Sequence, residues 1–586
     1  MSNTSSIRDI CLLCLVGLLA YLPGIASLPV IDRDEARYAQ SVVQMVETGD
    51  YIDIRFQDEP RYKKPVGAYW AQAAAIHVTG QADDVRRGER PIWAQRLPSV
   101  AGALVAVVFT YLAGVALLGR RAALVGAGLL AVSVSLVFEA HQAKTDALLA
   151  GGSAVVLYGL AARKVWAVWL GVAAGVLVKG PVIVAVAGLA VGTLLFLPLD
   201  GEGGPTRKRW VGRGEPPTNN KAIARDEGSP LPTSLRSATF PVKGKEGIGW
   251  LLRPLPILVA LAIVLPWFVA IGMKSEGAFF AEALGRDFGA KLGSAQETHG
   301  GPPGYYALTT LVMFWPGVIA LPLAVAWAWR ERRVAEVTLL LAWLVPMWLV
   351  LEIVPTKLPH YTLPLYPALA LLCGGAVAAT DIVSQPRWRR LGIVLFLPMA
   401  VIVATVAVWA ALFDLDDMSG STFTTLALLV LGLGILSAAS WMMARQSAHQ
   451  WLVLPVSLGI MTSVVFWAYS GRLADSVGAY VASSLHKAAD GRRIVSPDFR
   501  EPSLVYLAGR DTRVDLDELA VGDILFAPFM ETDAAGCFGQ NGYVVGLNYA
   551  KGDTLIGAIF TTDACEPGEL ETWRAREAAR RSGSGG

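Results

Sequence analysis

The chain has 586 residues, of which 54% are hydrophobic and only 17% are charged, and its mean hydropathy is +0.47. Soluble globular domains carry about 25% charged residues. One water-surrounded core does not account for so much apolar side chain, so lipid must surround part of the chain. The formal net charge of +2 is close to neutral, and nothing indicates nucleic acid as a partner.

Apolar runs, each about long enough for one bilayer crossing, recur along the chain. The first ends in an acidic loop and lacks a small-residue cleavage pattern, which predicts a retained helix and not a removed signal. The fold class predicted is a polytopic α-helical membrane protein with about thirteen spans. The expected spans are 10–28, 94–118, 122–138, 147–162, 165–178, 181–198, 250–272, 306–328, 335–353, 362–380, 391–413, 422–443 and 450–468.

Basic residues in short loops indicate the orientation, because such loops favour the cytoplasmic side. With the N-terminus inside, the cytoplasmic side receives Arg120-Arg121, Arg163-Lys164, Arg330 to Arg333, Arg387 to Arg390 and Arg445. It also receives residues 199–249, whose Gly, Pro, Lys and Arg content is typical of a poorly ordered linker. We therefore expect a multi-pass membrane protein with its larger loops on the outer side.

Three larger features fall on the outer side. Loop 29–91 contains two runs of helical spacing, 36–46 and 68–77, which predict helices on the membrane surface, with Tyr69 and Trp70 suited to the interface. Loop 274–305 ends in glycines and tyrosines, and is either a lid or a plain connector. The tail, 471–586, predicts a small α/β domain with strands at 503–507, 523–529, 543–549 and 555–561. Its Cys537 and Cys565 would pair in an oxidising compartment.

Charged residues beside the bilayer are costly and often functional. An acidic cluster directly follows the first predicted span, and basic residues lie close to it in sequence. The alternative is a solvated, charge-balanced loop. The candidate site residues here are Asp32, Asp34, Glu35, Arg37, Tyr38, Lys63 and Lys64.

Two further turns on the same side carry polar groups. The turn from Glu139 to Asp146 includes His141; Asp146 begins a helix, so a helix N-cap is the alternative to a role in the site. The turn from Pro355 to Tyr361 has two prolines that stiffen a segment with Lys357, His360 and Tyr361. Its basic group is suited to a lipid phosphate, from the membrane or from a lipid-linked substrate.

Together these features resemble the membrane glycosyltransferases of the GT-C class, within it most closely the lipid A aminoarabinose transferases and the protein-mannosyltransferase-like group. The resemblance covers about residues 1–470, which would be the GT-C transmembrane domain. The tail, 471–586, gives no motif that can be placed. The motifs are Asp34-Glu35-Ala36-Arg37-Tyr38-Ala39, Gly49-Asp50-Tyr51, Tyr62-Lys63-Lys64-Pro65, Thr145-Asp146-Ala147, Val178-Lys179-Gly180 and Lys357-Leu358-Pro359-His360-Tyr361-Thr362-Leu363-Pro364.

The resemblance implies inverting transfer of a sugar from a polyprenyl-phosphate donor to lipid A or another envelope glycolipid. It places the protein in a bacterial inner membrane, with the active site and the C-terminal domain on the periplasmic face. Asp34 and Asp146 would be the catalytic carboxylates. Asp34 would act as a base for a hydroxyl acceptor, or orient an acceptor that is already an anionic phosphate. The groups implied for the donor phosphate are Arg37, Lys64, Arg286 and Tyr361. Lys179, from the Val178-Lys179-Gly180 motif, is a further candidate site residue without an assigned role. Beyond the lipid-linked donor no cofactor is expected, and we expect a monomer.

Two departures from the family pattern bear on metal and sugar. The family often has Glu before Lys-Pro in the first outer loop, where this chain has Lys63. It often has His after Glu in the second, where Ala283 follows Glu282. In the aminoarabinose transferases those positions can help to hold a metal, so we expect no such metal site here. The additional positive charge at Lys63 favours an anionic or neutral sugar over the cationic aminoarabinose.

Two alternatives stay open at this stage. One is a protein O-mannosyltransferase-like enzyme, which differs only in its acceptor. The other is a lipid or sugar transporter or flippase. Transporters tend to show internal repeats and polar groups near the bilayer midplane. This sequence shows no convincing repeat, and its polar clusters lie at helix ends, which favours the enzyme.

Overall fold

The computed structural model describes residues 3–30, 33–196, 248–283, 285, 300–379, 386–413, 456–460, 462–463, 478–528, 537–548 and 553–583. Asp32, Arg286, most of linker 199–249 and span 422–443 lie outside these residues. So does most of span 450–468. The predictions made for them are therefore left as they stand.

Apolar helices form a bundle at the positions where the sequence predicts them. Its elements are α1 (Asn3–Tyr21), α5 (Ile92–Leu118), α6 (Arg120–Ala131), α7 (Val134–Ala140), α8 (Asp146–Ala161), α9 (Val165–Lys179), α10 (Val182–Phe196), η2 (Gly249–Leu252), α11 (Pro254–Lys274), α12 (Ala278–Phe280), α14 (Tyr305–Met313), η4 (Gly317–Ala320), α15 (Leu321–Glu331), α16 (Ala335–Ile353), η5 (Pro359–Leu365), α17 (Tyr366–Ala378) and α19 (Pro386–Phe413). The helix α1 ends at Tyr21, earlier than the expected span.

Length and composition allow four helices of the described chain to cross a membrane, or up to six if each bent pair is one span. The bent pairs replace two expected straight spans: α6 and α7 differ in direction by 56°, and residues 305–331 bend by 119° between α14 and the following helix. Helices α8, α9 and α10 are apolar but shorter. The structure is thus a helical bundle with several apolar helices, while the number thirteen stays a prediction.

Close helix contacts depend on glycine at two places that matter for the site. A Cβ atom on Gly102 of α5 would lie 2.8 Å from the Ala147 carbonyl oxygen, and one on Gly67 would lie 2.7 Å from the Leu177 carbonyl oxygen. Real Cβ atoms do not tolerate such distances, so a larger residue would push the segments apart. The glycines therefore let the start of α8 pack on α5, and the start of α3 pack on the end of α9.

The first outer loop folds as a compact unit. Its elements are α2 (Arg33–Thr48), β1 (Arg55–Phe56), β2 (Glu59–Pro60), α3 (Gly67–Val78) and α4 (Ala82–Arg86). Both predicted helices are present. Tyr69 is fully buried and stacks on Tyr38, with ring centroids 4.8 Å apart. The prediction that Tyr69 serves the membrane interface is therefore wrong, because packing against α2 takes up its ring, whereas Trp70 is partly exposed.

The C-terminal residues form an α/β unit around a four-stranded sheet of order β3-β4-β6-β5. Strands β3 and β4 are parallel and the other pairs are antiparallel. Opposite faces of the sheet bury different clusters, one under α22 and α23 and the other under α24. The elements are α22 (Gly478–Ala489), β3 (Ile494–Val495), α23 (Pro502–Ala508), η7 (Leu516–Glu518), β4 (Ile524–Pro528), β5 (Gly539–Asn548), β6 (Asp553–Thr561) and α24 (Pro567–Gly583).

Three of the four predicted strands are present, as β4, β5 and β6. The prediction of a strand at 503–507 is wrong, because these residues form α23. Pro502 occupies the first helical position, where its missing N–H has no cost, and α23 packs against α2 of the first outer loop. Cys537 and Cys565 form a disulfide.

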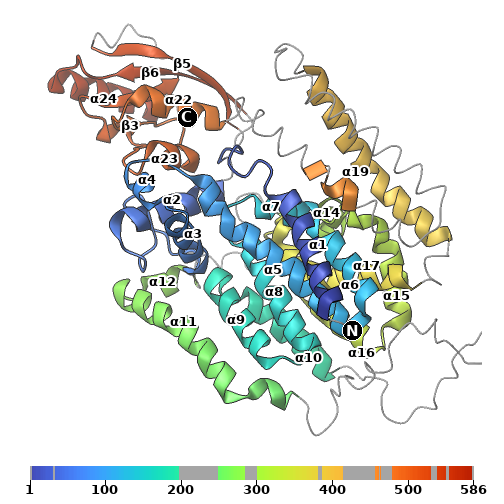
Figure 1. The fold of residues 1–586 in the computed structure, drawn as a ribbon. Helices are drawn as coiled ribbons and strands as arrows, with labels where there is room; N and C mark the ends of the chain where they lie inside the picture. Colours follow the sequence, from blue (N-terminus) through green and yellow to red (C-terminus); the bar gives the residue numbers. More distant parts are fainter. Residues whose placement is uncertain are drawn as a thin grey trace, which may run out of the picture.

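The C-terminal unit lies over α2 and α4, and the chain's N-terminus lies at the opposite end of the bundle (Figure 1). At that opposite end, Arg120 donates to both carboxylate oxygens of Asp9, 2.5 and 2.6 Å away. The basic pair Arg120-Arg121 is thus on the side of the N-terminus, as the charge rule predicts, and away from the first outer loop.

Candidate active site

Asp34 lies in the first turn of α2 and is surrounded by cations. Its carboxylate Oδ1 is 3.6 Å from Arg37 Nη1 and 3.9 Å from Arg61 Nη2, while 60% of its side chain is exposed. Desolvation raises the pKa of Asp34, but the positive charges of Arg61, Lys144, Arg37 and Lys64 outweigh it and hold the pKa below its usual range. Asp34 is therefore ionised at neutral pH.

Arg61 is held in place by aromatic rings. Its guanidinium lies 5.2 Å from the ring centroid of Tyr38, which stacks on Tyr69, and its side chain is only 8% exposed. Burial raises the pKa of Tyr38 well above its usual value, so the phenol stays protonated. Packing against the Tyr38 ring therefore holds the Arg61 guanidinium in one orientation.

The two helix ends that flank the turn before α8 contribute two buried carboxylates, Glu139 near the end of α7 and Asp146 at the start of α8. Lys144 Nζ is 3.6 Å from Glu139 Oε2, and Lys179 Nζ is 2.5 Å from Asp146 Oδ1. The His360 imidazole lies between the two acids, with Nδ1 3.8 Å from Glu139 and Nε2 3.9 Å from Asp146. Asp146 occupies the first position of α8 with Thr145 as N-cap. The N-cap alternative for Asp146 is therefore wrong.

Tyr361 joins this cluster from η5, whereas Lys357, in the turn before η5, does not. Lys179 Nζ lies 5.4 Å from the ring centroid of Tyr361. Lys357 Nζ instead donates to the Gly301 carbonyl oxygen at 2.8 Å, while the Glu352 carboxylate accepts from the backbone N–H groups of Gly304 and Tyr306, each at 3.0 Å. Lys357 therefore anchors the end of the second outer loop.

Glu35 has a structural partner. Its carboxylate is fully buried and accepts from Arg96 Nε at 2.8 Å and Arg96 Nη2 at 2.9 Å. It also accepts from the Ala143 backbone N–H at 2.8 Å. Arg96 donates in addition to the carbonyl oxygens of Ile25 and Leu28. Glu35 thus ties α2, which carries Asp34, to the turn that carries Lys144 and Asp146.

Two other predicted residues lie outside the cation cluster. Both ring nitrogens of His141 are 2.8 Å from backbone carbonyl oxygens, of Val137 and Pro23, and burial lowers its pKa to about 4. The ring therefore braces the turn. Lys63 is exposed beside Lys64, whose Nζ donates to the Lys63 carbonyl oxygen at 3.1 Å.

The structure also places residues that received no role from the sequence. Arg61, Glu139 and Lys144 lie in the predicted outer loops, but they were assigned no role in the site. Arg96 lies in a predicted span and was not a candidate either. Arg61 precedes Lys63-Lys64 in one basic run, which was a usable signal. Arg96 lies inside the apolar run of α5, where a lone charged residue is itself a sign of a buried partner.

Among the residues that the structure describes, no group of three or more His, Cys, Asp or Glu side chains is placed to hold a metal ion. Lys63 and Ala283 stand at the two positions where the resemblance led us to look for metal ligands. The prediction that this site works without a metal stays a prediction.

No family model matches the chain. Among its relatives are two proteins that are each 26% identical to this chain over the aligned residues. Both are called undecaprenyl phosphate-alpha-4-amino-4-deoxy-L-arabinose arabinosyl transferase. One, from Enterobacter sp. (strain 638), aligns over 63% of this chain and 59% of its own length. The other, from Yersinia pestis (strain Pestoides F), aligns over 75% and 72%.

Solved structures extend the likeness over almost the whole chain. ArnT from Cupriavidus metallidurans in the apo state superposes with a TM-score of 0.65 at 16% identity, covering 96% of this chain and 98% of that one. This chain has the GT-C fold. The predicted resemblance to the membrane glycosyltransferases of that class is confirmed. The form of ArnT bound to undecaprenyl phosphate gives the same TM-score at 17% identity, covering 95% and 98%.

Proposed function

We propose that this chain is an inverting glycosyltransferase that moves a sugar from a polyprenyl-phosphate donor to lipid A or another envelope glycolipid at the periplasmic membrane face. The observation that carries the proposal is the convergence of four cations on the exposed carboxylate of Asp34. A second, more buried acid–base cluster lies around Asp146. Relatives named for transfer from undecaprenyl phosphate support the same donor.

In the proposed reaction, the acceptor oxygen bonds to the anomeric carbon of the sugar. The bond from that carbon to the donor phosphate breaks, and its electron pair leaves with polyprenyl phosphate. Negative charge therefore grows on the departing phosphate, and cations already in place stabilise it most. Arg37 and Lys64 take this role. The family resemblance adds Arg286 to the groups that hold the phosphate, and it adds Tyr361, whose ring centroid lies 5.4 Å from Lys179 Nζ.

The lowered pKa of Asp34 bears on the acceptor. Positive neighbours keep this carboxylate ionised but make it a weaker base. A phosphate acceptor is already anionic and loses no proton during transfer, so Asp34 then only orients the groups and balances their charge. A hydroxyl acceptor would have to pass its proton to Asp34. The charges at Asp34 thus favour a phosphate of lipid A as the attacking group.

Two features support a periplasmic site. The first outer loop, whose helix α2 carries Asp34, lies under the C-terminal unit at one end of the bundle, and the N-terminus lies at the other (Figure 1). The Asp9–Arg120 pair ties the N-terminal helix α1 to the start of α6, beside the basic loop. The C-terminal unit on the side of the site contains a disulfide. Structural disulfides persist in oxidising compartments such as the periplasm. A bacterial inner-membrane location is part of the same proposal.

The test is Asp34→Asn in protein purified into lipid nanodiscs, with Asp83→Asn as the control. Asp83 forms an exposed pair with Arg86 in the same loop. We expect the first variant to lose sugar transfer roughly a hundredfold or more, and the control to match wild type. Full activity of Asp34→Asn in folded protein would remove the catalytic assignment.

The sugar and the acceptor need separate assays. A panel of polyprenyl-phosphate sugars tests the inference from Lys63, which favours neutral or anionic sugars; use of aminoarabinose alone would contradict it. Mass spectrometry of lipid and protein fractions from a deletion strain tests the acceptor. Loss of a sugar from protein, with unchanged lipid A, would replace the proposal with an O-mannosyltransferase-like function.

A further inference from the structure

The C-terminal unit forms an ion pair with the first outer loop at the residue next to Asp34. Arg33, the residue before Asp34, donates through Nε and Nη2 to the two carboxylate oxygens of Glu501, at 2.8 and 2.7 Å. Glu501 is only 4% exposed. It occupies the N-cap position of α23, yet its carboxylate does not cap that helix. The carboxylate is directed across the interface to Arg33 instead.

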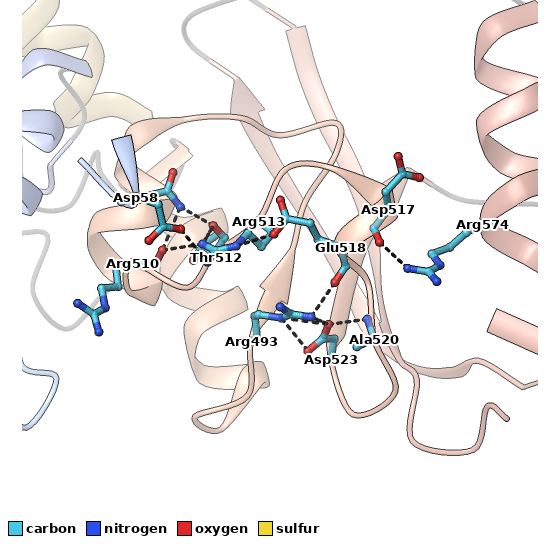
Figure 2. Close-up of polar contacts among 11 residues, drawn as sticks. Asp58, Arg493, Arg510, Thr512, Arg513, Asp517, Glu518, Ala520, Asp523 and Arg574 are labelled. Atoms are coloured by element: carbon cyan, nitrogen blue, oxygen red, sulfur yellow. Dashed lines mark hydrogen bonds and ion pairs between the residues drawn. The ribbon is translucent and has the colours of Figure 1, made fainter. Parts of the chain in front are cut away.

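The C-terminal unit also forms hydrogen bonds with the turn between β1 and β2. The Gln57 side-chain amide donates to the carbonyl oxygens of Arg510 and Thr512, at 3.1 and 2.5 Å. Arg513 Nη2 donates to Asp58 at 3.1 Å, and Figure 2 shows Arg513 between Asp58 and Glu518. The C-terminal unit thus holds both residues at the tip of this turn.

The turn is also tied to α2. The Gln57 backbone N–H donates to Gln44 Oε1, and Gln44 Nε2 donates to the Gln57 carbonyl oxygen, both at 2.8 Å. Gln44 lies on α2 and is 6% exposed. A polar path of paired groups therefore runs from the C-terminal unit through the turn into the helix that begins with Arg33 and Asp34.

An apolar contact seals the same interface. Tyr506 of α23 is fully buried and belongs to the core of the first outer loop, not to that of its own domain. Its carbonyl oxygen accepts from Arg90 Nε at 2.8 Å. The two units therefore share one packed core at this point, which limits their relative movement.

Both sets of contacts involve residues that are next to site residues in the sequence. Arg33 precedes Asp34, and β2 runs into Arg61 and Lys64. We propose that the C-terminal domain positions the active site, with Glu501 acting on Asp34 through Arg33, and with Arg513 acting on Arg61 and Lys64 through the β1–β2 turn. This inference rests on the proposed function, since it assigns positioning residues for that reaction. Displacements of about 1 Å can cost roughly a hundredfold in rate.

The test uses Glu501→Gln and Arg513→Ala in the full chain in nanodiscs. Asp563→Asn is the control, because its ion pair with Arg492 at 2.8 Å lies within the same domain. We expect kcat to fall about tenfold or more in each test variant, and the control to match wild type. The exchanged pair Arg33→Glu with Glu501→Arg should recover part of the rate lost in Glu501→Gln.

Hydrogen exchange gives a readout that needs no activity. We expect faster exchange at residues 33–40 in Glu501→Gln and at residues 55–64 in Arg513→Ala, with other segments of the C-terminal domain unchanged. Unchanged exchange in both variants overturns the inference, and so does faster exchange with an unchanged kcat. Wild-type protein that transfers no sugar from any donor, yet shows these exchange effects, would refute the proposed function and leave the docking contact standing.

Discussion

Replacement of Glu35 by alanine tests whether the acidic motif is partly structural. The change removes a carboxylate that accepts two bonds from Arg96 and one from the Ala143 N–H, all inside a region with no exposed side-chain surface. Removing one partner of a buried ion pair typically costs about 3–5 kcal/mol, because the remaining charge stays buried. The carbonyl oxygens of Ile25 and Leu28 still accept from Arg96, so we expect the lower end of that range.

The assay is chemical unfolding in detergent micelles, followed by tryptophan fluorescence. Asp83→Ala is the matched control, because its ion pair with Arg86 in the same loop is exposed. Surface substitutions usually change the free energy of unfolding by less than about 0.5 kcal/mol. A free energy of unfolding for Glu35→Ala within about 1 kcal/mol of wild type would refute the reasoning. Such a change would be smaller than the cost of leaving the Arg96 charge buried without its partner.

Three further predictions concern the disulfide, the pH profile and the second outer loop. Cys537→Ser should destabilise the C-terminal domain by roughly 3–4 kcal/mol, since the bond closes a loop of 28 residues; thermal unfolding checks this against Cys11→Ser, an exposed cysteine. The pKa of Asp34 is lowered, so its carboxylate is lost only as the pH falls below the usual aspartate range. Arg37→Gln removes one cation and should move the acidic limb of the rate profile to higher pH; an unmoved limb would contradict this. Lys357→Met should speed hydrogen exchange at residues 300–306, because the bond to the Gly301 carbonyl oxygen is lost, whereas Lys63→Met should not.

The sequence was most informative where local composition decides the structure. Apolar runs predict helices because lipid leaves a spanning backbone few alternatives, and the helices from α5 to α19 match ten of the expected spans, two of them as bent pairs. The strand prediction at 503–507 failed for the opposite reason. A short apolar run is compatible with a strand or a helix. In the structure it forms a helix that packs against α2.

Asp34 was identifiable from sequence because an acid at the end of an apolar run is costly and stands out. Only the family resemblance assigned the catalytic role to Asp34, and composition and charge alone could not separate it from Glu35 beside it. The tertiary structure does so, since Arg96 is 61 residues from Glu35 along the chain yet pairs with it, while Asp34 faces Arg37 and Arg61. Likewise Glu501 is 468 residues from Arg33. Such pairings depend on which helices pack together, and charge alone does not encode a partner.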